Sequence, residues 1–126
     1  MNKEQLEVLE VASEYIVKLI GGIKETVSCF QSGKEKQGLD MITPIGNGIG
    51  YIMDVITLLP LELDSDATIE NLNTQLEELV QGLENEDYVL VSDMFSYEIL
   101  PIFEEIKIHM EHLNINVCEA DKKDIT

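Results

Sequence analysis

The strongest constraint in the sequence is the spacing of its apolar residues, which recur every three or four positions along four long stretches. Such spacing places apolar side chains on one side of an α-helix, whereas a half-buried strand needs alternation at every second residue. The four stretches cover residues 9–30, 42–59, 69–83 and 88–113. Because no segment alternates over a useful length, the sequence predicts an all-α fold. About 70% or more of the residues should be helical, which is roughly double the usual share.

Turn signals between the four stretches indicate how the helices are connected. The first stretch ends before Gly33, the second is stopped by Pro60, and the link at residues 62–66 contains Asp and Ser residues that favour a helix start. Links this short favour antiparallel neighbours. We therefore expect an antiparallel up-down-up-down four-helix bundle that forms a single domain at residues 1–115, followed by a flexible polar tail at residues 116–126.

Two prolines fall inside helical patterns. Pro44 and Pro101 should each kink a helix or mark its start, because proline has no N–H to donate and its ring crowds the preceding turn. The second helix could therefore be broken at Pro44. The segments 30–41 and 83–94 each join one helix to the next and both end in Asp-Met. This similarity indicates either two related helical hairpins or a chance match.

The charge balance excludes several kinds of partner. The chain has 25 acidic residues, 8 lysines and no arginine, and its formal net charge is −17. Residues 37–106 contain no basic residue at all. Nucleic-acid binding needs a basic surface, and anionic membranes would repel such a chain. We therefore expect no binding to nucleic acid or to membranes. The charge either serves only to keep the protein soluble or suits a basic partner.

Cysteine usage and the charged start of the chain indicate the cytoplasm. Cys29 and Cys118 form no CxxC pair, and the opening residues are too charged for a secretory leader. Both thiols should therefore stay reduced. The longest uncharged run, residues 41–53, is too short and too rich in glycine to span a bilayer. The sequence predicts a cytoplasmic protein.

The fourth stretch carries a pattern that could bind a metal. Glu105, His109 and His112 would lie on neighbouring turns of one helix, so their side chains could share an ion. The Glu-x-x-His pairs of carboxylate di-iron proteins are absent. Two surface histidines on a polar helix end explain the same pattern. We therefore predict no metal and no other cofactor, and keep these three residues as the only candidates.

Two further motifs invite a functional interpretation. Asp64-Ser65 precedes a helix, as does the modified serine of acyl carrier proteins, but the next residue is Asp where Leu is usual, and a capping role explains both residues. Gly46 and Gly50 belong to a G-x-G-x-G run without the strand that a phosphate loop needs. Their spacing of one helical turn better suits the close approach of a neighbouring helix. No arrangement of catalytic residues follows, so we do not expect an enzyme.

The fourth helix has apolar residues on two sides. Its predicted core line consists of Tyr88, Phe95, Ile99, Ile102 and Ile106. At about 100° per residue, a second set gathers on another side of the helix. This set consists of Leu90, Met94, Tyr97, Pro101 and Ile108. A helix that is apolar on two sides must be buried on both. The second side could bind a partner helix or a second copy, or the first and third helices could cover it.

Residues 87–101 read D-Y-V-L-V-S-D-M-F-S-Y-E-I-L-P. This segment resembles a signature of a small acidic four-helix family of unknown function from Gram-positive bacteria, whose members read close to D-Y-x-L-L-A-D-L-L-E-Y-E-L-x-P. Ser92 and Ser96 stand where that family usually has Ala and Glu. The resemblance implies a helical fold and no particular activity. The layout also resembles that of flagellin export chaperones, in architecture only.

The sequence therefore predicts a bacterial, acidic, non-catalytic protein-protein interaction module, which would act as an adaptor, a chaperone-like protein or a homodimer. The alternative is a small metal-binding or acyl-carrier-like helical protein. A metal role would require Glu105, His109 and His112 to converge on one point. A carrier role would require a covalent group on Ser65.

Overall fold

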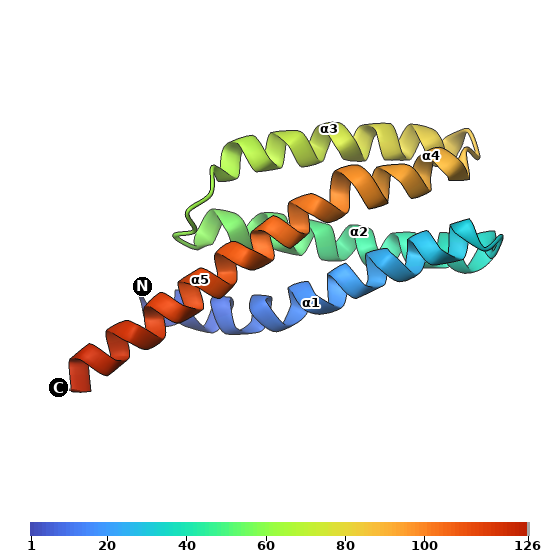
Figure 1. Ribbon diagram of the computed structural model, residues 1–126. Helices are drawn as coiled ribbons and strands as arrows, with labels where there is room; N and C mark the ends of the chain where they lie inside the picture. The colour runs from blue at the N-terminus through green and yellow to red at the C-terminus, as the bar shows by residue number, and fades with distance from the viewer. Residues whose placement is uncertain (126) are drawn as a thin grey trace.

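The computed structural model describes residues 1–125, with side chains for residues 1–119. Helices account for 88% of the chain, which confirms the predicted all-α fold. They are α1 (Lys3–Gln31), α2 (Glu35–Leu58), α3 (Ser65–Glu84), α4 (Tyr88–Asp93), the π-helical segment η1 (Met94–Ile99) and α5 (Leu100–Ile125). The last three follow one another without a break and form one long rod (Figure 1).

The rod lies across a hairpin made of α1 and α2, and α3 runs alongside its first half (Figure 1). The chain reverses direction between α1 and α2, between α2 and α3, and again between α3 and α4. Helix α1 packs against α2, α4, η1 and α5, whereas α2 meets α3 at few positions. Helix α1 is therefore the element on which most of the others pack.

Side-chain caps define the starts of three helices. The Asn2 side chain accepts a hydrogen bond of 2.8 Å from the Gln5 N–H, and the Gln5 side chain accepts one of 3.0 Å from the Asn2 N–H. Asp64 and Asp87 cap α3 and α4 by accepting from the N–H three residues later, at 3.0 and 3.1 Å. Such caps satisfy N–H groups that the first helical turn leaves without partners. The polar residues in the links thus fix where each helix begins.

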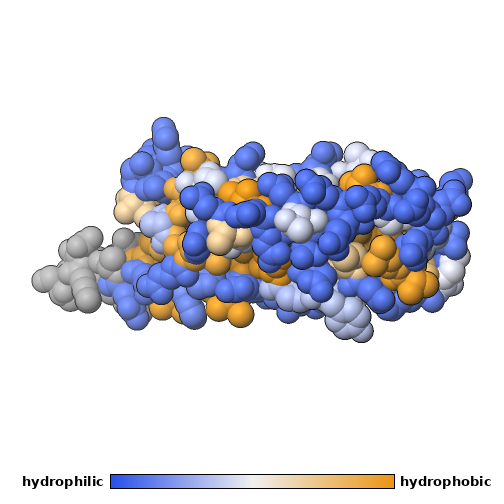
Figure 2. Space-filling model, turned by 90° about the horizontal axis from the view of Figure 1, so that it is seen from above, coloured by the Kyte–Doolittle hydropathy of each residue, from blue (hydrophilic) through white to orange (hydrophobic). Residues whose placement is uncertain are grey.

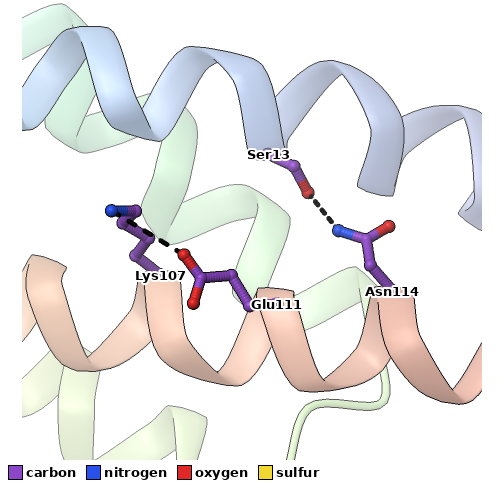
Figure 3. Close-up of polar contacts among 4 residues, drawn as sticks. All are labelled: Ser13, Lys107, Glu111 and Asn114. Carbon is purple, nitrogen blue, oxygen red and sulfur yellow. Dashed lines mark hydrogen bonds and ion pairs between the residues drawn. The ribbon is translucent and has the colours of Figure 1, made fainter.

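The core is a single cluster of apolar side chains drawn from every helix. Its largest fully buried members are Leu9, Ile16, Ile23, Ile49, Ile52, Ile56, Leu72, Phe95, Ile99, Phe103, Ile106 and Met110. Each side chain of this size contributes roughly 1.5–3 kcal/mol when it leaves water. Near the end of the described side chains, the Asn114 amide donates to the Ser13 hydroxyl at 2.9 Å and joins α5 to α1 (Figure 3).

Helix α2 runs unbroken through Pro44, so the break considered from the sequence does not occur. Proline cannot donate to the carbonyl of Asp40 four residues earlier. Both residues are exposed, which leaves that carbonyl open to water. Helix α2 is also the one helix among the described residues that is long and apolar enough to cross a membrane, with a mean hydropathy of 1.2. A core helix passes the same test, and Ile49 and Ile52 lie in the core, so this is weak evidence for a span.

A widened turn, the π-helical segment η1 (Met94–Ile99), lies in the rod just before Pro101. The Leu100 N–H donates to the Phe95 carbonyl five residues earlier, which is the hydrogen bond of a π-helix. In a regular α-helix the Pro101 ring would crowd the carbonyl of Tyr97. Regular helix resumes at Leu100, so Pro101 lies in the first turn of α5, where a missing N–H is tolerated. Pro101 thus marks a helix start, as one of the two sequence interpretations predicts.

The widened turn changes which residues of the rod face the core. It holds one more residue than an α-helical turn and rotates everything after it by about 100°. Met94 and Phe95 are both buried, and Phe103 is fully buried while Ile102 is only half-buried. The predicted core line omitted Phe103 because it assumed a continuous α-helix, and two of its members, Tyr88 and Ile102, are only partly buried against the core.

Residues 116–125, expected to form a polar tail outside the domain, continue α5 as helix, and this end projects past the start of α1 (Figure 1). One more expectation from the sequence differs from the structure. Gly46 and Gly50 do not mark the close approach of another helix, since a Cβ at either position would have nothing within 4 Å. Gly48 marks it instead, because a Cβ there would meet the Tyr15 hydroxyl and would lie 2.9 Å from Leu19 Cδ1.

The contrast between these glycines gives a testable prediction. Gly48→Ala should lower the free energy of unfolding by about 1–3 kcal/mol, because Tyr15 and Leu19 must shift to admit a methyl group. Gly46→Ala should raise it by about 0.5–1 kcal/mol, because alanine loses less backbone entropy in an open helical position. Urea unfolding followed by circular dichroism measures both. Equal effects of the two substitutions would contradict the packing described for α1 and α2.

Candidate functional site

The structure separates the five residues predicted to form an interaction surface. Met94 is buried, with 5% of its surface exposed, so its assignment to that surface is wrong. Leu90 is partly exposed but leans towards α3, since its Cδ2 lies 3.4 Å from a Cβ built on Gly82. The remaining three, Tyr97, Pro101 and Ile108, are exposed. The widened turn is the cause, because it carries these three away from the side on which a continuous α-helix would place them.

With the widened turn counted, five exposed apolar residues of the rod, Leu90 not among them, fall on the side opposite the core. We call this set the outer stripe, and it consists of Val89, Tyr97, Pro101, Ile108 and Ile115. Val89 and Tyr97 are the most exposed of these, at 75% and 74%. Sequence analysis missed Val89 and Ile115. The proline inside a helical pattern was the signal that the helical phase changes there.

Acidic side chains border the outer stripe. Asp93, Glu98, Glu104 and Glu105 are all exposed on the same rod. Lys107 is the only lysine between residues 88 and 119, and it pairs with Glu111 at 3.7 Å (Figure 3). Seen from above, the surface is mostly hydrophilic, with apolar patches that include the end where α3 turns into α4 (Figure 2). The rod therefore combines an apolar line with a negative border.

A pocket of about 380 Å³ opens beside the first residue of the outer stripe. We call it the end pocket, and it is lined by Phe30, Gln31, Glu35, Tyr88, Val89, Ser92 and Asp93. These residues come from the end of α1, the start of α2 and both ends of α4. Sequence analysis did not predict the pocket, because its walls meet only through the packing of distant segments.

Two aromatic rings form one wall of the end pocket. The Phe30 and Tyr88 rings are stacked, with centroids 5.4 Å apart and planes 9° from parallel. Phe30 is buried and Tyr88 is half-buried, so the tyrosine shields the phenylalanine from solvent. Desolvation raises the pKa of the Tyr88 phenol above 10.0, and the negative charges of Glu86 and Glu35 raise it further. The phenol is thus neutral at physiological pH and lies in a negative environment.

Ser92, which lines the end pocket, carries a buried hydroxyl without a partner. Ser92 is 4% exposed, and its hydroxyl oxygen forms no hydrogen bond, the one such case among the buried side chains that the structure describes. Leaving a buried hydroxyl unbonded costs free energy, so native proteins usually pair such groups with protein, water or a ligand. The widened turn begins two residues later, and π turns occur frequently at functional sites.

The candidate metal ligands do not converge. His109 Nε2 lies 3.8 Å from Glu105 Oε1 on the same helix, and His112 is exposed one turn further on. Within the described residues, no group of three or more His, Cys, Asp or Glu side chains is arranged to hold a metal ion. Glu105 and His109 instead line a polar hollow with Asp64 from the link between α2 and α3.

The other candidates from the sequence have structural roles or lie apart. Asp64 caps α3 and Ser65 is the first residue of that helix, which is the capping arrangement considered from the sequence. Cys29 is buried in α1 and Cys118 is exposed in α5, and both are free thiols.

The pKa of Tyr88 provides a test of the geometry of the end pocket. Glu86→Gln and Glu35→Gln should each lower this pKa, because a negative neighbour disfavours the phenolate. The folded-state pKa lies above the unfolded value, so the neutral phenol stabilises the fold below pH 10.0. That contribution is lost as the pH rises through the folded-state pKa. NMR titration of the tyrosine rings measures the shift, with Glu98→Gln as the control. An unchanged pKa in both variants would contradict the placement of Tyr88.

The family described as a domain of unknown function (DUF8042) matches residues 7–109, which span most of α1 and continue into α5. The matched segment includes the end pocket and all of the outer stripe except Ile115. No curated protein and no solved structure matches the chain. The match covers well over half of the sequence, and the chain belongs to the DUF8042 family.

Proposed function

We propose that this domain is a non-catalytic, cytoplasmic protein-binding module, built as an antiparallel four-helix bundle, that docks a partner on the outer stripe. The supporting observation is the alignment of Val89, Tyr97, Pro101, Ile108 and Ile115 along one exposed side of the rod. Single exposed apolar residues are normal on protein surfaces, but an aligned set is typical of an association surface. The resemblance of residues 87–101 to a signature from Gram-positive bacteria leads us to propose a bacterial source.

The size of the outer stripe indicates the kind of complex it supports. From residue 89 to residue 115 a helix rises about 39 Å at 1.5 Å per residue. A face about 10 Å wide over that length offers about 400 Å², against the roughly 800 Å² per partner of a standard interface. The apolar line alone falls short of a permanent interface. The acidic border must contribute contacts, and the complex should be one that forms and dissociates readily.

The titratable groups give little support to catalysis. A general acid or base works best with a pKa near neutral pH, and such values usually arise where ionisable groups are buried together. The one pKa shift resolved among the described residues, at Tyr88, moves away from neutral pH. The alternative, a metal or acyl carrier, rests on His109 and Ser65. His109 contacts a single carboxylate, that of Glu105, and Ser65 is the first residue of α3.

A double substitution on the outer stripe tests the proposed function. Tyr97→Glu with Ile108→Glu should remove at least about 1.4 kcal/mol of contact energy, which corresponds to binding that is about tenfold weaker. The variant should therefore no longer capture the partner from native cytosol. Helix content and the thermal midpoint should stay close to those of the unmodified protein, because both positions are exposed. Quantitative cross-linking with mass spectrometry measures the capture.

Val11→Glu with Val80→Glu is the matched control, since these valines are exposed on α1 and α3 rather than on the rod. The control should keep the partner. The proposal is wrong if the rod variant and the control capture the same partners equally, or if the rod variant unfolds and so reveals the stripe as core.

A further inference from the structure

We propose that the end pocket binds a lysine or arginine side chain of the partner that docks on the outer stripe, so that the partner is a basic amphipathic segment. This inference rests on the proposed function and names the chemistry of its partner. Three features of the pocket carry it: its aromatic wall, its acidic rim and its continuity with the outer stripe.

The aromatic wall suits a cation. The face of a tyrosine ring carries partial negative charge and attracts an ammonium or guanidinium group placed within about 6 Å. Tyr88 is held in place by its stack on Phe30, with 5.4 Å between the ring centroids. Because this ring is already ordered, binding would cost little side-chain entropy.

The acidic rim comes from two different helices. Glu35 lies at the start of α2 and Asp93 at the end of α4, and both are exposed. Neither forms an ion pair within the part of the chain that the structure describes, even though Lys34 and Lys36 flank Glu35 in sequence. Two carboxylates that line one pocket and form no ion pair favour a basic ligand, which can form charge-assisted hydrogen bonds to both.

The pocket is continuous with the outer stripe because Val89 belongs to both. A partner helix lying along Tyr97, Pro101 and Ile108 would therefore reach the pocket with one of its ends. At 1.5 Å per residue, the pocket begins about 12 Å beyond Tyr97. Its apolar side would cover the outer stripe and a basic residue near its end would enter the pocket. Recognition of an amphipathic helix through spaced anchors is a common mode of binding.

Charge distinguishes this partner from a second copy of the chain. A second copy would bring 25 acidic residues and only 8 lysines towards a surface already bordered by Glu98, Glu104 and Glu105. Like charges across an interface oppose association, whereas a basic segment meets the border with opposite charge. The partner should therefore bind less tightly as salt concentration rises.

The test uses small probes that carry one side chain each. N-acetyl-lysine N-methylamide and N-acetyl-arginine N-methylamide are titrated into the full ¹⁵N-labelled chain at physiological salt, with N-acetyl-glutamine N-methylamide as the neutral control. We expect saturable amide shifts confined to residues 30–35 and 88–93, with a dissociation constant on the order of 10 mM for so few contacts. The neutral probe should cause none. A lack of saturation, or equal shifts at acidic residues across the whole surface, overturns the proposal.

Substitutions in the pocket complete the test. Glu35→Gln with Asp93→Asn should weaken probe binding about three- to tenfold, since two charged contacts are lost. Glu10→Gln with Glu25→Gln removes two exposed charges from α1 and should leave binding unchanged. Equal losses in the pocket variant and this control would show a general charge effect and overturn the proposal.

The outcomes separate this inference from the proposed function. Probe binding in the pocket together with unchanged partner capture by the Tyr97→Glu and Ile108→Glu variant would retain the basic-side-chain site and reject the outer stripe. Loss of partner capture in that variant without probe binding would retain the stripe and reject the site.

Discussion

The widened turn before Pro101 is the constraint on which the rest of the rod depends. A proline ring crowds the carbonyl four residues earlier, which here belongs to Tyr97. The bond from the Leu100 N–H to the Phe95 carbonyl opens that turn by one residue and allows the helix to continue. Every side chain after it is rotated by about 100°, so Phe103, Ile106 and Met110 enter the core while Ile108 faces solvent.

The same turn connects the core to both candidate binding features. On its N-terminal side, α4 is only six residues long and contributes Tyr88, Ser92 and Asp93 to the end pocket. On its C-terminal side, α5 presents Pro101 and Ile108 on the outer stripe. The net charge of −17 also affects this surface, because acidic side chains of the rod border the stripe and the one lysine between residues 88 and 119 is already paired with Glu111. Apolar contact and opposite charge together point to a basic amphipathic partner.

Local features of the sequence predicted the helices well, because caps and turns act over a few residues. Gly33 ends α1 with a φ of +77°, and Asp64 caps α3, as their residue types indicate. The predicted interaction surface was wrong at Met94, because the prediction assumed α-helical periodicity and a π turn departs from it. The end pocket could not be predicted from neighbouring residues in the sequence, because Phe30 and Tyr88 meet only when α1 and α4 pack together. Pro101 inside a helical pattern was the one local sign that the periodicity would change.

The most direct measurement of this account compares the free energies of unfolding of Phe103→Ala and Ile102→Ala. With the widened turn in place, Phe103 is fully buried and its truncation should cost about 3–5 kcal/mol. Ile102 is only half-buried, and its truncation should cost about 1–2 kcal/mol. A continuous α-helix would put Ile102 on the core line and turn Phe103 aside. A larger loss for Ile102→Ala than for Phe103→Ala would therefore contradict the widened turn and the outer stripe that depends on it.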